Sequence, residues 1–342
     1  MSSEVTLKQI ANALGVSTMT VSRAMNNSDK VSDRTKKKIR AKAREMGYTP
    51  NHIAKSLLSQ KTNTIGVVIP EIHHMFFSQV ISGIESVIYE NNYHLFLTNS
   101  SEEFEREKDV IETLRSRRVD GILISCAEDS NQDEYYKGLI DSGTKMVFFD
   151  RCVENIGASC VCVNDRLSSH LITKHLIDHG YKRIAHLAGS SNLSISRERF
   201  GGYKDALEES GLDFDEALVK TSGFREDGGY KAMQLLLEET KGNTPEAVVA
   251  VNDPVAFGAI KAIIEAGLTI PDDIAIVGFS DDIRSELMPV PLTTIEQPAY
   301  QMGVRAAKKL IKLIESDAEP IENIYMNTSL VIRKSCGTHN DL

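Results

Sequence analysis

The chain has 342 residues, of which 25% are charged and 41% hydrophobic, and its formal net charge is −9. No apolar stretch approaches the ~18 residues of a membrane span, and the first residues lack a secretory signal, so we expect a cytoplasmic protein of two or three domains. The five cysteines are scattered and lack the paired spacing of a zinc site, so we expect buried, reduced thiols. They are Cys126, Cys152, Cys160, Cys162 and Cys336.

The charge is divided unevenly along the chain. Residues 1–62 hold 12 lysines and arginines against four acidic residues, a charge of +8, whereas the other 280 residues carry −17. A basic head on an acidic body indicates that the head contacts a polyanion and the body does not. A solvated, lysine-rich helix face would explain residues 36–44 alone equally well.

Three short helices are predicted in the head. The first begins with a capping box and ends at Gly15, the second follows Ser17, and the third runs from Ser32 to about Met46. A helix, a glycine turn and a second helix form a helix-turn-helix arrangement. Because the major groove of DNA admits one helix, we expect the polar face of the second helix to contact DNA, with Arg23 reading guanine or clamping phosphate.

The head resembles the LacI/GalR family of bacterial transcription regulators, which includes the lactose and purine repressors. The similarity lies in TLKQIANALGVSTMTVSRAMN (6–26), VSDRTKKKI (31–39), GYTPN (47–51) and AKSL (54–57), and it continues through nearly the whole chain. It implies that the start of the second helix distinguishes operators and that neighbouring groups hold phosphates. The implied DNA-binding residues are Ser17, Thr18, Met19, Thr20, Ser22, Arg23, Asn26, Ser32, Tyr48, Asn51, Lys55 and Leu57.

Residues 51–62 are short, polar and weakly helical, which describes a flexible linker as well as a helix. The resemblance implies a hinge helix that folds on the operator and inserts Leu57 into the minor groove, with Lys55 beside it. We therefore expect a DNA-binding domain at 1–50 and a hinge at 51–62.

From residue 64 onward, short β-branched runs alternate with helix-length amphipathic segments, which is typical of parallel α/β sheets. The runs are too many for one small sheet, so we expect residues 63–342 to form two doubly wound lobes, the architecture of periplasmic binding proteins. The first set is 64–70, 93–99, 120–126 and 145–150, and the second is 159–164, 183–189, 217–223, 247–253 and 274–280. The expected division is about 63–158 plus 294–325 for lobe 1 and about 159–293 plus 326–335 for lobe 2.

Ligands of such sheets bind beyond the carboxyl ends of the strands. The residues there are rich in carboxylates, amides and aromatic rings, which suit a polyhydroxylated ring, although Asn and Asp at such positions are often helix caps. The candidates are Glu71 to Phe77, Asn99, Ser125, Asp150 and Arg151 in the first lobe, and Asn164, Asp165, Phe224, Asn252, Asp253, Ser280 and Asp281 in the second.

The resemblance implies a narrower effector site with Arg197 as a bidentate clamp. Where several relatives have an aspartate after a glycine-aromatic pair, this chain has Ser280, so the contact is expected from Asp281 or is lost. The effector therefore stays open. The implied effector-binding residues are Phe76, Phe77, Asp150, Arg197, Phe224, Asn252 and Asp281.

We expect a ligand-responsive repressor of carbohydrate-utilisation genes that binds a pseudo-palindromic operator as a homodimer, because a two-fold pair doubles the few base contacts of one small head. The segment Phe77–Glu90 is a candidate for the dimer interface, against simple packing on its own sheet. Whether the effector, a sugar or sugar derivative, induces or corepresses stays open. The C-terminal segment has no leucine heptad, so we expect no tail-mediated tetramer.

Three alternatives stay open at this point. A regulator of the same family could be controlled by a purine or by a partner protein. A partner protein could dock on the basic face of residues 298–314. A sugar-binding receptor without DNA function would share the two lobes. An enzyme would need a P-loop, nucleophile elbow or dinucleotide fingerprint, and none is present in the sequence. We expect no cofactor, and the adjacent His73 and His74 lack an identified third ligand for a metal.

Overall fold

The computed structural model describes residues 5–48, 61–128, 133–316 and 318–337. The chain divides into two compact units, Met1–Thr62 and Asn63–Leu342, which we call the head and the body. No helix of the described residues is both long enough and apolar enough to cross a membrane.

The head contains the three helices that the sequence predicts. Thr6 and Gln9 form the predicted capping box, and Gly15 ends the first helix in the left-handed conformation with φ 66°. Ser17 and Ser32 cap the next two helices through their side chains. The helices are α1 (Leu7–Leu14), α2 (Thr18–Met25) and α3 (Asp33–Glu45). They enclose a small core of Ile10, Ala11, Val21, Ala24, Val31, Ile39 and Ala43.

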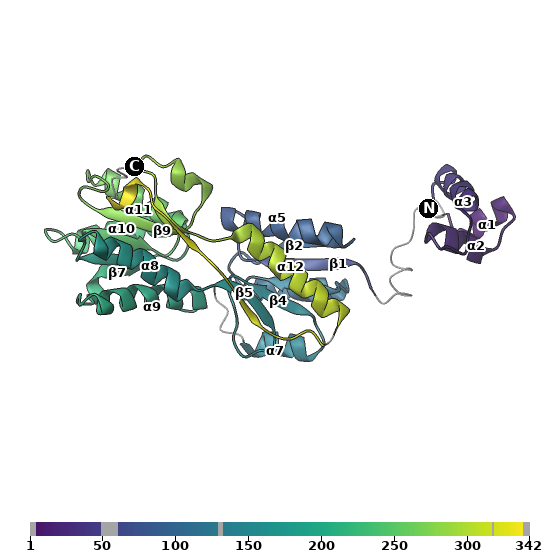
Figure 1. Ribbon diagram of the computed structural model, residues 1–342, viewed down its shortest axis with the longest axis horizontal. Coiled ribbons are helices and arrows are strands. Elements are labelled where there is room, and N and C mark those ends of the chain that lie inside the picture. The colour runs from purple at the N-terminus through teal and green to yellow at the C-terminus, as the bar shows by residue number, and fades with distance from the viewer. Residues whose placement is uncertain (1–4, 49–60, 129–132, 317, 338–342) are drawn as a thin grey trace. The chain divides into compact units, whose positions relative to one another are not determined.

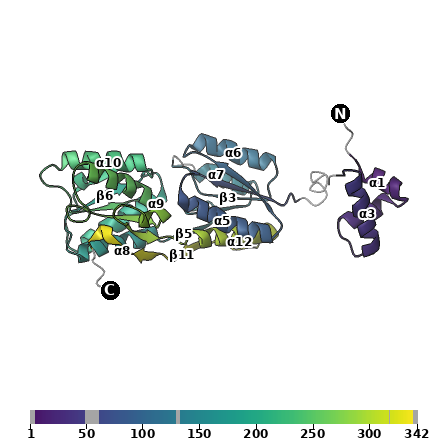
Figure 2. The same ribbon diagram turned by 90° about the horizontal axis from the view of Figure 1, so that it is seen from above.

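The body has two six-stranded sheets, and the first is parallel throughout, with strand order β11-β5-β4-β3-β1-β2 (Figures 1 and 2). Its strands are β1 (Thr64–Ile69), β2 (His94–Asn99), β3 (Gly121–Ile124), β4 (Met146–Phe149), β5 (Ser159–Val163) and β11 (Asn323–Met326). Helices α5 (Met75–Glu90) and α12 (Ala299–Glu315) cover one face, and α6 (Phe104–Ser116) and α7 (Asp133–Asp141) the other. Because both faces are covered, side chains alternate along β4 between two buried clusters.

The second sheet has the order β12-β10-β9-β8-β6-β7, in which β12 is antiparallel to β10. Its strands are β6 (Ile184–Ala188), β7 (Val219–Thr221), β8 (Ala247–Ala250), β9 (Ala275–Ser280), β10 (Thr293–Glu296) and β12 (Ser329–Val331). Its helices are α8 (Asp165–Asp178) and α9 (Ser194–Glu209) on one face and α10 (Glu226–Glu239) and α11 (Asp253–Glu265) on the other. The prediction of two doubly wound lobes is confirmed.

The assignment of residues 159–164 to the second lobe is wrong. In the structure β5 pairs in parallel with β4 and β11, so it belongs to the first sheet, and the chain enters the second lobe only at α8. The boundary near residue 294 falls inside β10, which pairs with β9 in the second sheet. The chain crosses again after β10 and between β11 and β12, where Figure 1 shows the C-terminal segment in yellow. Strand partners are set by hydrogen bonds between distant segments, which the order of strands along the chain does not reveal.

Helices α5 and α12 approach each other closely at two glycines. A Cβ on Gly83 would lie 2.0 Å from the Tyr300 carbonyl oxygen, and one on Gly303 would lie 2.0 Å from that of Val80. Most apolar residues of Phe77–Glu90, including Val80, are therefore buried inside the subunit. Simple packing explains them better than a dimer interface does.

Two cysteines differ from the expected reduced state. Cys152, in the segment after β4, is joined to Cys160 of β5 by a disulfide with a Cα–Cα distance of 5.8 Å. The sequence does not show that these positions are neighbours, because the pairing of β4 with β5 brings them together. The other three cysteines are buried and lie outside this disulfide, as expected.

Candidate functional site

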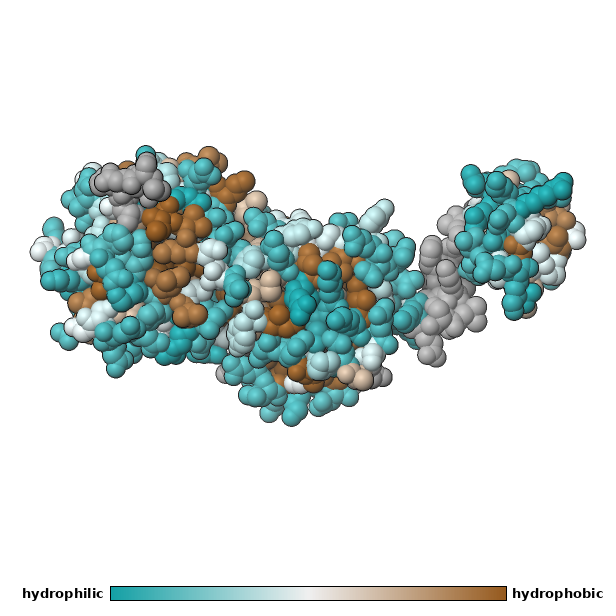
Figure 3. Space-filling model, in the orientation of Figure 1, coloured by the Kyte–Doolittle hydropathy of each residue, from teal (hydrophilic) through white to brown (hydrophobic). Residues whose placement is uncertain are grey.

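Helix α2 presents a polar face to solvent. Val21 and Ala24 are buried, whereas Thr18, Met19 and Arg23 are exposed. The face shown in Figure 3 is largely hydrophilic over the head. An exposed helix with an arginine and short polar side chains is the kind of element that enters the major groove.

The remaining predicted DNA-binding residues of the head lie around this helix. Ser17 accepts a hydrogen bond from the Thr20 backbone at 3.0 Å, and Ser32 accepts one from the Thr35 backbone at 3.4 Å, so both serines act as caps while staying exposed. Asn26 is exposed as well. Thr20, Ser22 and Tyr48 are half-buried. Asn51, Lys55 and Leu57 lie outside the described residues.

In the body, a cavity between the two lobes gathers most of the predicted effector residues. It lies where the carboxyl ends of the strands face each other, as the rule for open α/β sheets predicts. Of the residues implied by the resemblance, the cavity includes Phe76, Phe77, Asp150, Phe224 and Asn252. Its other lining residues are Glu71, His74, Glu102, Arg151, Ile195, Arg199, Ser280 and Gln297.

Arg151 forms a buried ion pair on the first-lobe side of the cavity. Its Nη1 and Nη2 donate to the two carboxylate oxygens of Glu102 at 2.8 and 3.0 Å, and Nη1 also donates to the Cys126 carbonyl at 2.8 Å. The guanidinium lies 5.1 Å from the centre of the Phe224 ring, which belongs to the other lobe. Arg151 therefore contacts groups of both lobes at once.

Arg199 forms the corresponding pair on the second-lobe side. Its Nε donates to Asp165 at 2.7 Å, its Nη1 donates to the Val251 carbonyl at 2.8 Å, and its guanidinium lies 3.7 Å from the Phe279 ring centre. Burial raises the pKa of Asp165 to about 6 despite the arginine. Burial also raises the pKa of Asp150 in the same cavity.

The structure places two residues implied by the resemblance away from this cavity. Arg197 is exposed and donates to the carbonyls of Ser191 and Asn192 at 2.9 and 2.8 Å. Asp281 pairs with Arg333 at 2.8 Å. Arg197 lines a second cavity and Asp281 does not line the first, so the predicted roles of both in the interlobe cavity lack support from the geometry.

The sequence contains a signal that would have selected Arg199. Residues two apart on a helix lie about 200° apart, so Arg197 and Arg199 occupy opposite faces of α9. Arg199 lies four residues after Ile195 and four before Tyr203, both buried, and so shares their inward stripe. Glu102 carries no such signal, because it lies in a loop after β2.

The turn after β9 determines which residue faces the cavity. Asp253 accepts hydrogen bonds from the Asp282 backbone at 2.7 Å, Thr294 Oγ1 at 2.6 Å and Ser285 Oγ at 2.9 Å. The anchored turn places Ser280 in the cavity lining. Asp253, a candidate by the strand-end rule, therefore has a structural role.

Several buried polar atoms of the cavity have no hydrogen-bond partner among the described residues. Among them are His74 Nδ1, Arg151 Nε and Ser280 Oγ. Burial lowers the pKa of His74 to about 4, so its imidazole is neutral near pH 7 and offers one donor and one acceptor. Unpaired buried polar groups are unfavourable, so these atoms are suited to hydrogen-bond a polar ligand.

The head and body match two known families. Residues 6–51 match "Bacterial regulatory proteins, lacI family", and residues 173–336 match the "Periplasmic binding protein-like domain". The chain belongs to the lacI family of bacterial regulatory proteins. It is a ligand-responsive, DNA-binding repressor and not an enzyme, as the sequence predicts.

Similar proteins extend over nearly the whole chain. The "HTH-type transcriptional repressor PurR" of Pasteurella multocida (strain Pm70) is 34% identical over 96% of this chain and 98% of its own length. The "Ribose operon repressor" of Haemophilus influenzae (strain ATCC 51907 / DSM 11121 / KW20 / Rd) is 32% identical over the same shares. The structure of the lac repressor dimer bound to operator and the anti-inducer ONPF has a TM-score of 0.87 and 27% identity, covering 97% of this chain and 99% of that one. The "transcriptional regulator CelR-cellobiose complex" has a TM-score of 0.74 and 28% identity, covering 97% and 100%.

Proposed function

We propose that this repressor acts in the cytoplasm on carbohydrate-utilisation genes, binding a pseudo-palindromic operator as a homodimer whose affinity is set by a sugar or sugar derivative in the interlobe cavity. The observation that carries the proposal is the composition of that cavity. Carboxylates, amides and a neutral imidazole stand beside aromatic rings. Planar polar groups bind adjacent hydroxyls, and aromatic rings cover the apolar face of a sugar.

The ionic balance of the cavity favours a neutral ligand over a phosphorylated one. Both arginines that line it are already paired with carboxylates, Arg151 with Glu102 and Arg199 with Asp165. Glu71 and Asp150 add acidic groups to the lining. A phosphate would have to displace these buried pairs, whereas sugar hydroxyls can use the unpaired His74 Nδ1 and Ser280 Oγ.

A surface for dimerisation is available at the edge of the first sheet. Strand β2 ends the strand order there, and its Phe96 and Leu97 are each 42% exposed. Tyr89, near the end of α5, is 77% exposed. An apolar sheet edge is suited to isologous contact with a second copy. The solved lac repressor is described as a dimer on its operator, which supports the same assembly for this chain.

The proposed DNA-binding residues are those exposed on and around α2, together with Lys55 and Leu57 of the segment before the body. Effector binding between the lobes would change the relative orientation of the first lobes of the two subunits in the dimer. This change would alter the affinity for the operator. Induction and corepression remain two outcomes of the same coupling.

The test is a fluorescence-anisotropy titration of the full chain on the DNA upstream of its own gene, at one stated salt concentration. The ligand panel contains D-ribose, cellobiose, ribose 5-phosphate, hypoxanthine and guanine. A shift of the binding curve by a neutral sugar supports the proposal and gives its sign. A shift by purines alone assigns the purine alternative, and DNA binding that no ligand changes contradicts a small-molecule effector.

A further inference from the structure

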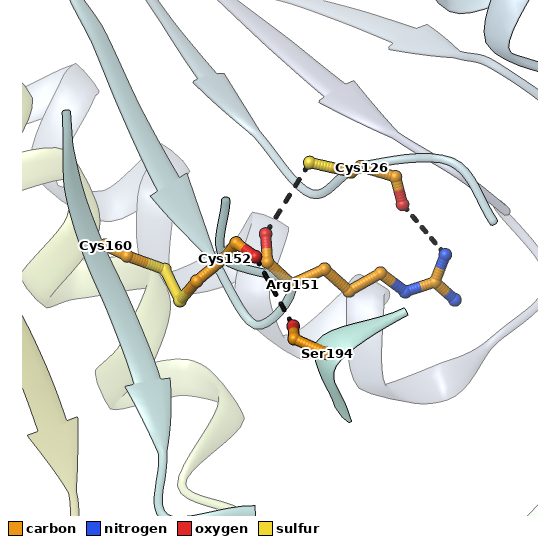
Figure 4. The surroundings of a disulfide bond; sticks show 5 residues. All are labelled: Cys126, Arg151, Cys152, Cys160 and Ser194. Atoms are coloured by element: carbon orange, nitrogen blue, oxygen red, sulfur yellow. Dashed lines mark hydrogen bonds between the residues drawn. A yellow bond between two sulfur atoms is a disulfide. The ribbon is translucent and has the colours of Figure 1, made fainter. Parts of the chain in front are cut away.

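The disulfide Cys152–Cys160 lies next to the interlobe cavity. Cys152 directly follows Arg151, whose guanidinium lines the cavity, and Cys160 lies in β5 beside it (Figure 4). The disulfide therefore ties the segment that carries Arg151 to the sheet of the first lobe. We call residues 150–158 the Arg151 loop.

The Arg151 loop contacts both lobes through its backbone. The Arg151 carbonyl accepts from Cys126 Sγ at 3.7 Å in the first lobe, and the Cys152 carbonyl accepts from Ser194 Oγ at 3.3 Å in the second (Figure 4). Ser194 begins α9, the helix that carries Arg199. A change in the mobility of this loop therefore affects the position of Arg151 and the contact between the lobes.

Cys152 is the more exposed cysteine of the pair. Cys152 is half-buried and lines a second cavity, which is also lined by Lys137 and Arg197, whereas Cys160 is buried. Thiol–disulfide exchange passes through a mixed disulfide and depends on access to the sulfur, which favours Cys152 as the first to react.

The neighbouring thiols are poorly suited to the same chemistry. Cys162 Sγ lies within 4.8 Å of both disulfide sulfurs, but burial raises its pKa to about 12. Burial also raises the pKa of Cys126 well above that of a free thiol. The fold also places Cys160, rather than either of these thiols, in bonding position against Cys152.

We propose that Cys152 and Cys160 form a reversible redox couple, oxidised by low-molecular-weight disulfides such as glutathione disulfide, that controls how firmly the Arg151 loop holds Arg151 in the interlobe cavity. This regulation rests on the proposed function of the cavity as the effector site. In the cytoplasm glutathione keeps most thiols reduced, and disulfides that do form there are commonly catalytic or redox-sensing.

The two thiols are oxidised in two thiol–disulfide exchange steps. The Cys152 thiolate attacks one sulfur of glutathione disulfide, forming a mixed disulfide and releasing one glutathione thiolate. The Cys160 thiolate then attacks Cys152 Sγ, forming the intramolecular disulfide and releasing the second glutathione thiolate. The protein loses two electrons and two protons, and the oxidant is reduced to two thiols.

The first measurement identifies the couple. The full chain is equilibrated at graded ratios of glutathione to glutathione disulfide with EDTA present, alkylated, and analysed by peptide mass spectrometry. As the proportion of glutathione disulfide rises, we expect the alkylated fractions of Cys152 and Cys160 to fall together. Cys126, Cys162 and Cys336 should stay alkylated. Persistence of both thiols under excess glutathione disulfide, or pairing of other cysteines, overturns the proposal.

The second measurement follows the loop itself by hydrogen–deuterium exchange. We expect residues 150–158 to exchange about tenfold more slowly in the oxidised protein, because the disulfide opposes local opening. Cys152→Ser should exchange like the reduced protein under both conditions, and Cys162→Ser should respond like the unaltered chain. Equal exchange in the two redox states overturns the proposal.

The last measurement separates this proposal from the one on the effector. D-ribose and cellobiose are titrated calorimetrically into the oxidised and reduced protein, and we expect about three- to tenfold tighter sugar binding when the loop is held, as for other preorganised sites. Equal affinity in both states contradicts control of the cavity. If neither sugar binds while the exchange response is present, the assignment of these sugars fails and the redox control of the loop stands.

Discussion

Replacing Arg199 by methionine should destabilise the body strongly, because it leaves the Asp165 carboxylate without its partner. The arginine and aspartate side chains are 4% and 8% exposed. Removal of one member of such a buried pair destabilises by about 3–5 kcal/mol. The exposed Arg197 contacts only backbone carbonyls, so Arg197→Met should change the unfolding free energy by no more than about 0.5 kcal/mol.

The effect should grow with pH. Burial holds the pKa of Asp165 at about 6 even beside Arg199, and loss of the guanidinium raises it further. The folded variant then binds a proton more tightly than the unfolded chain, so its stability falls as pH rises from the unfolded pKa through the elevated folded pKa. Each further unit of pKa adds about 1.4 kcal/mol of destabilisation above that range. The loss at about pH 8 should therefore exceed the loss at about pH 5.

The assay is urea unfolding of the full chain, followed by circular dichroism at several pH values, together with sugar titration. The double variant Asp165→Asn with Arg199→Met should recover most of the stability, because no buried charge is then left unpaired. Because Arg199 also lines the interlobe cavity, the double variant should still bind sugar more weakly than the unaltered chain. Equal stability of the Arg197 and Arg199 variants at all pH values would show that the buried pair of Arg199 with Asp165 does not stabilise the body.

Three further predictions follow from the described contacts. Arg23→Ala should weaken operator binding by about 2–6 kcal/mol for two half-sites in anisotropy titrations at fixed salt, with sugar affinity unchanged. Gly303→Ala should destabilise by at least about 1–3 kcal/mol in urea unfolding, since the new methyl group would meet the Val80 carbonyl on the facing helix. Ser280→Ala should weaken sugar binding about tenfold by calorimetry, as expected for loss of one hydrogen bond, whereas Asp281→Ala should leave it unchanged.

Each has a matched control. Lys37→Ala removes an exposed charge of α3 and should weaken DNA binding less than Arg23→Ala does. Gly138→Ala places a methyl group in open space on α7 and should stabilise by up to about 1 kcal/mol through helix propensity. If the Asp281 variant lost sugar binding and the Ser280 variant kept it, Asp281 and not Ser280 would be the residue of this turn that contacts the sugar. Equal unfolding midpoints for the two glycine variants would contradict the close approach of the helices.

Local patterns in the sequence were sufficient for the secondary structure of the head and most of the body. Thr6 with Gln9, and Ser17 and Ser32, are caps because their side chains reach amides within three residues, so no distant contact is needed. Strands β1 to β9 were recognisable as apolar runs, whereas β10, β11 and β12 were not predicted. Strand β12 has only three residues, with one apolar side chain on each face, so it shows no alternation of apolar and polar residues.

The interlobe cavity was partly predictable because parallel strands present their carboxyl ends at one edge of a sheet. That rule placed Phe76, Asp150 and Asn252 correctly at the interlobe cavity. The strand-end rule does not choose between Arg197 and Arg199, but the apolar stripe of α9, which includes Ile195 and Tyr203, would have selected Arg199. It also could not place Glu102, whose loop position depends on the buried pair with Arg151.

Sequence patterns were therefore sufficient for the first nine strands, the basic head and the edge of the sheets at which the interlobe cavity lies. These properties depend on side-chain periodicity, capping and charge, which act between residues close in the chain. Only the tertiary structure decided that β5 joins the first sheet, that Cys152 meets Cys160, and that Ser280 faces the cavity while Asp281 pairs with Arg333. Each of these depends on contacts between segments that the fold brings together, and such contacts leave no periodic trace in the sequence.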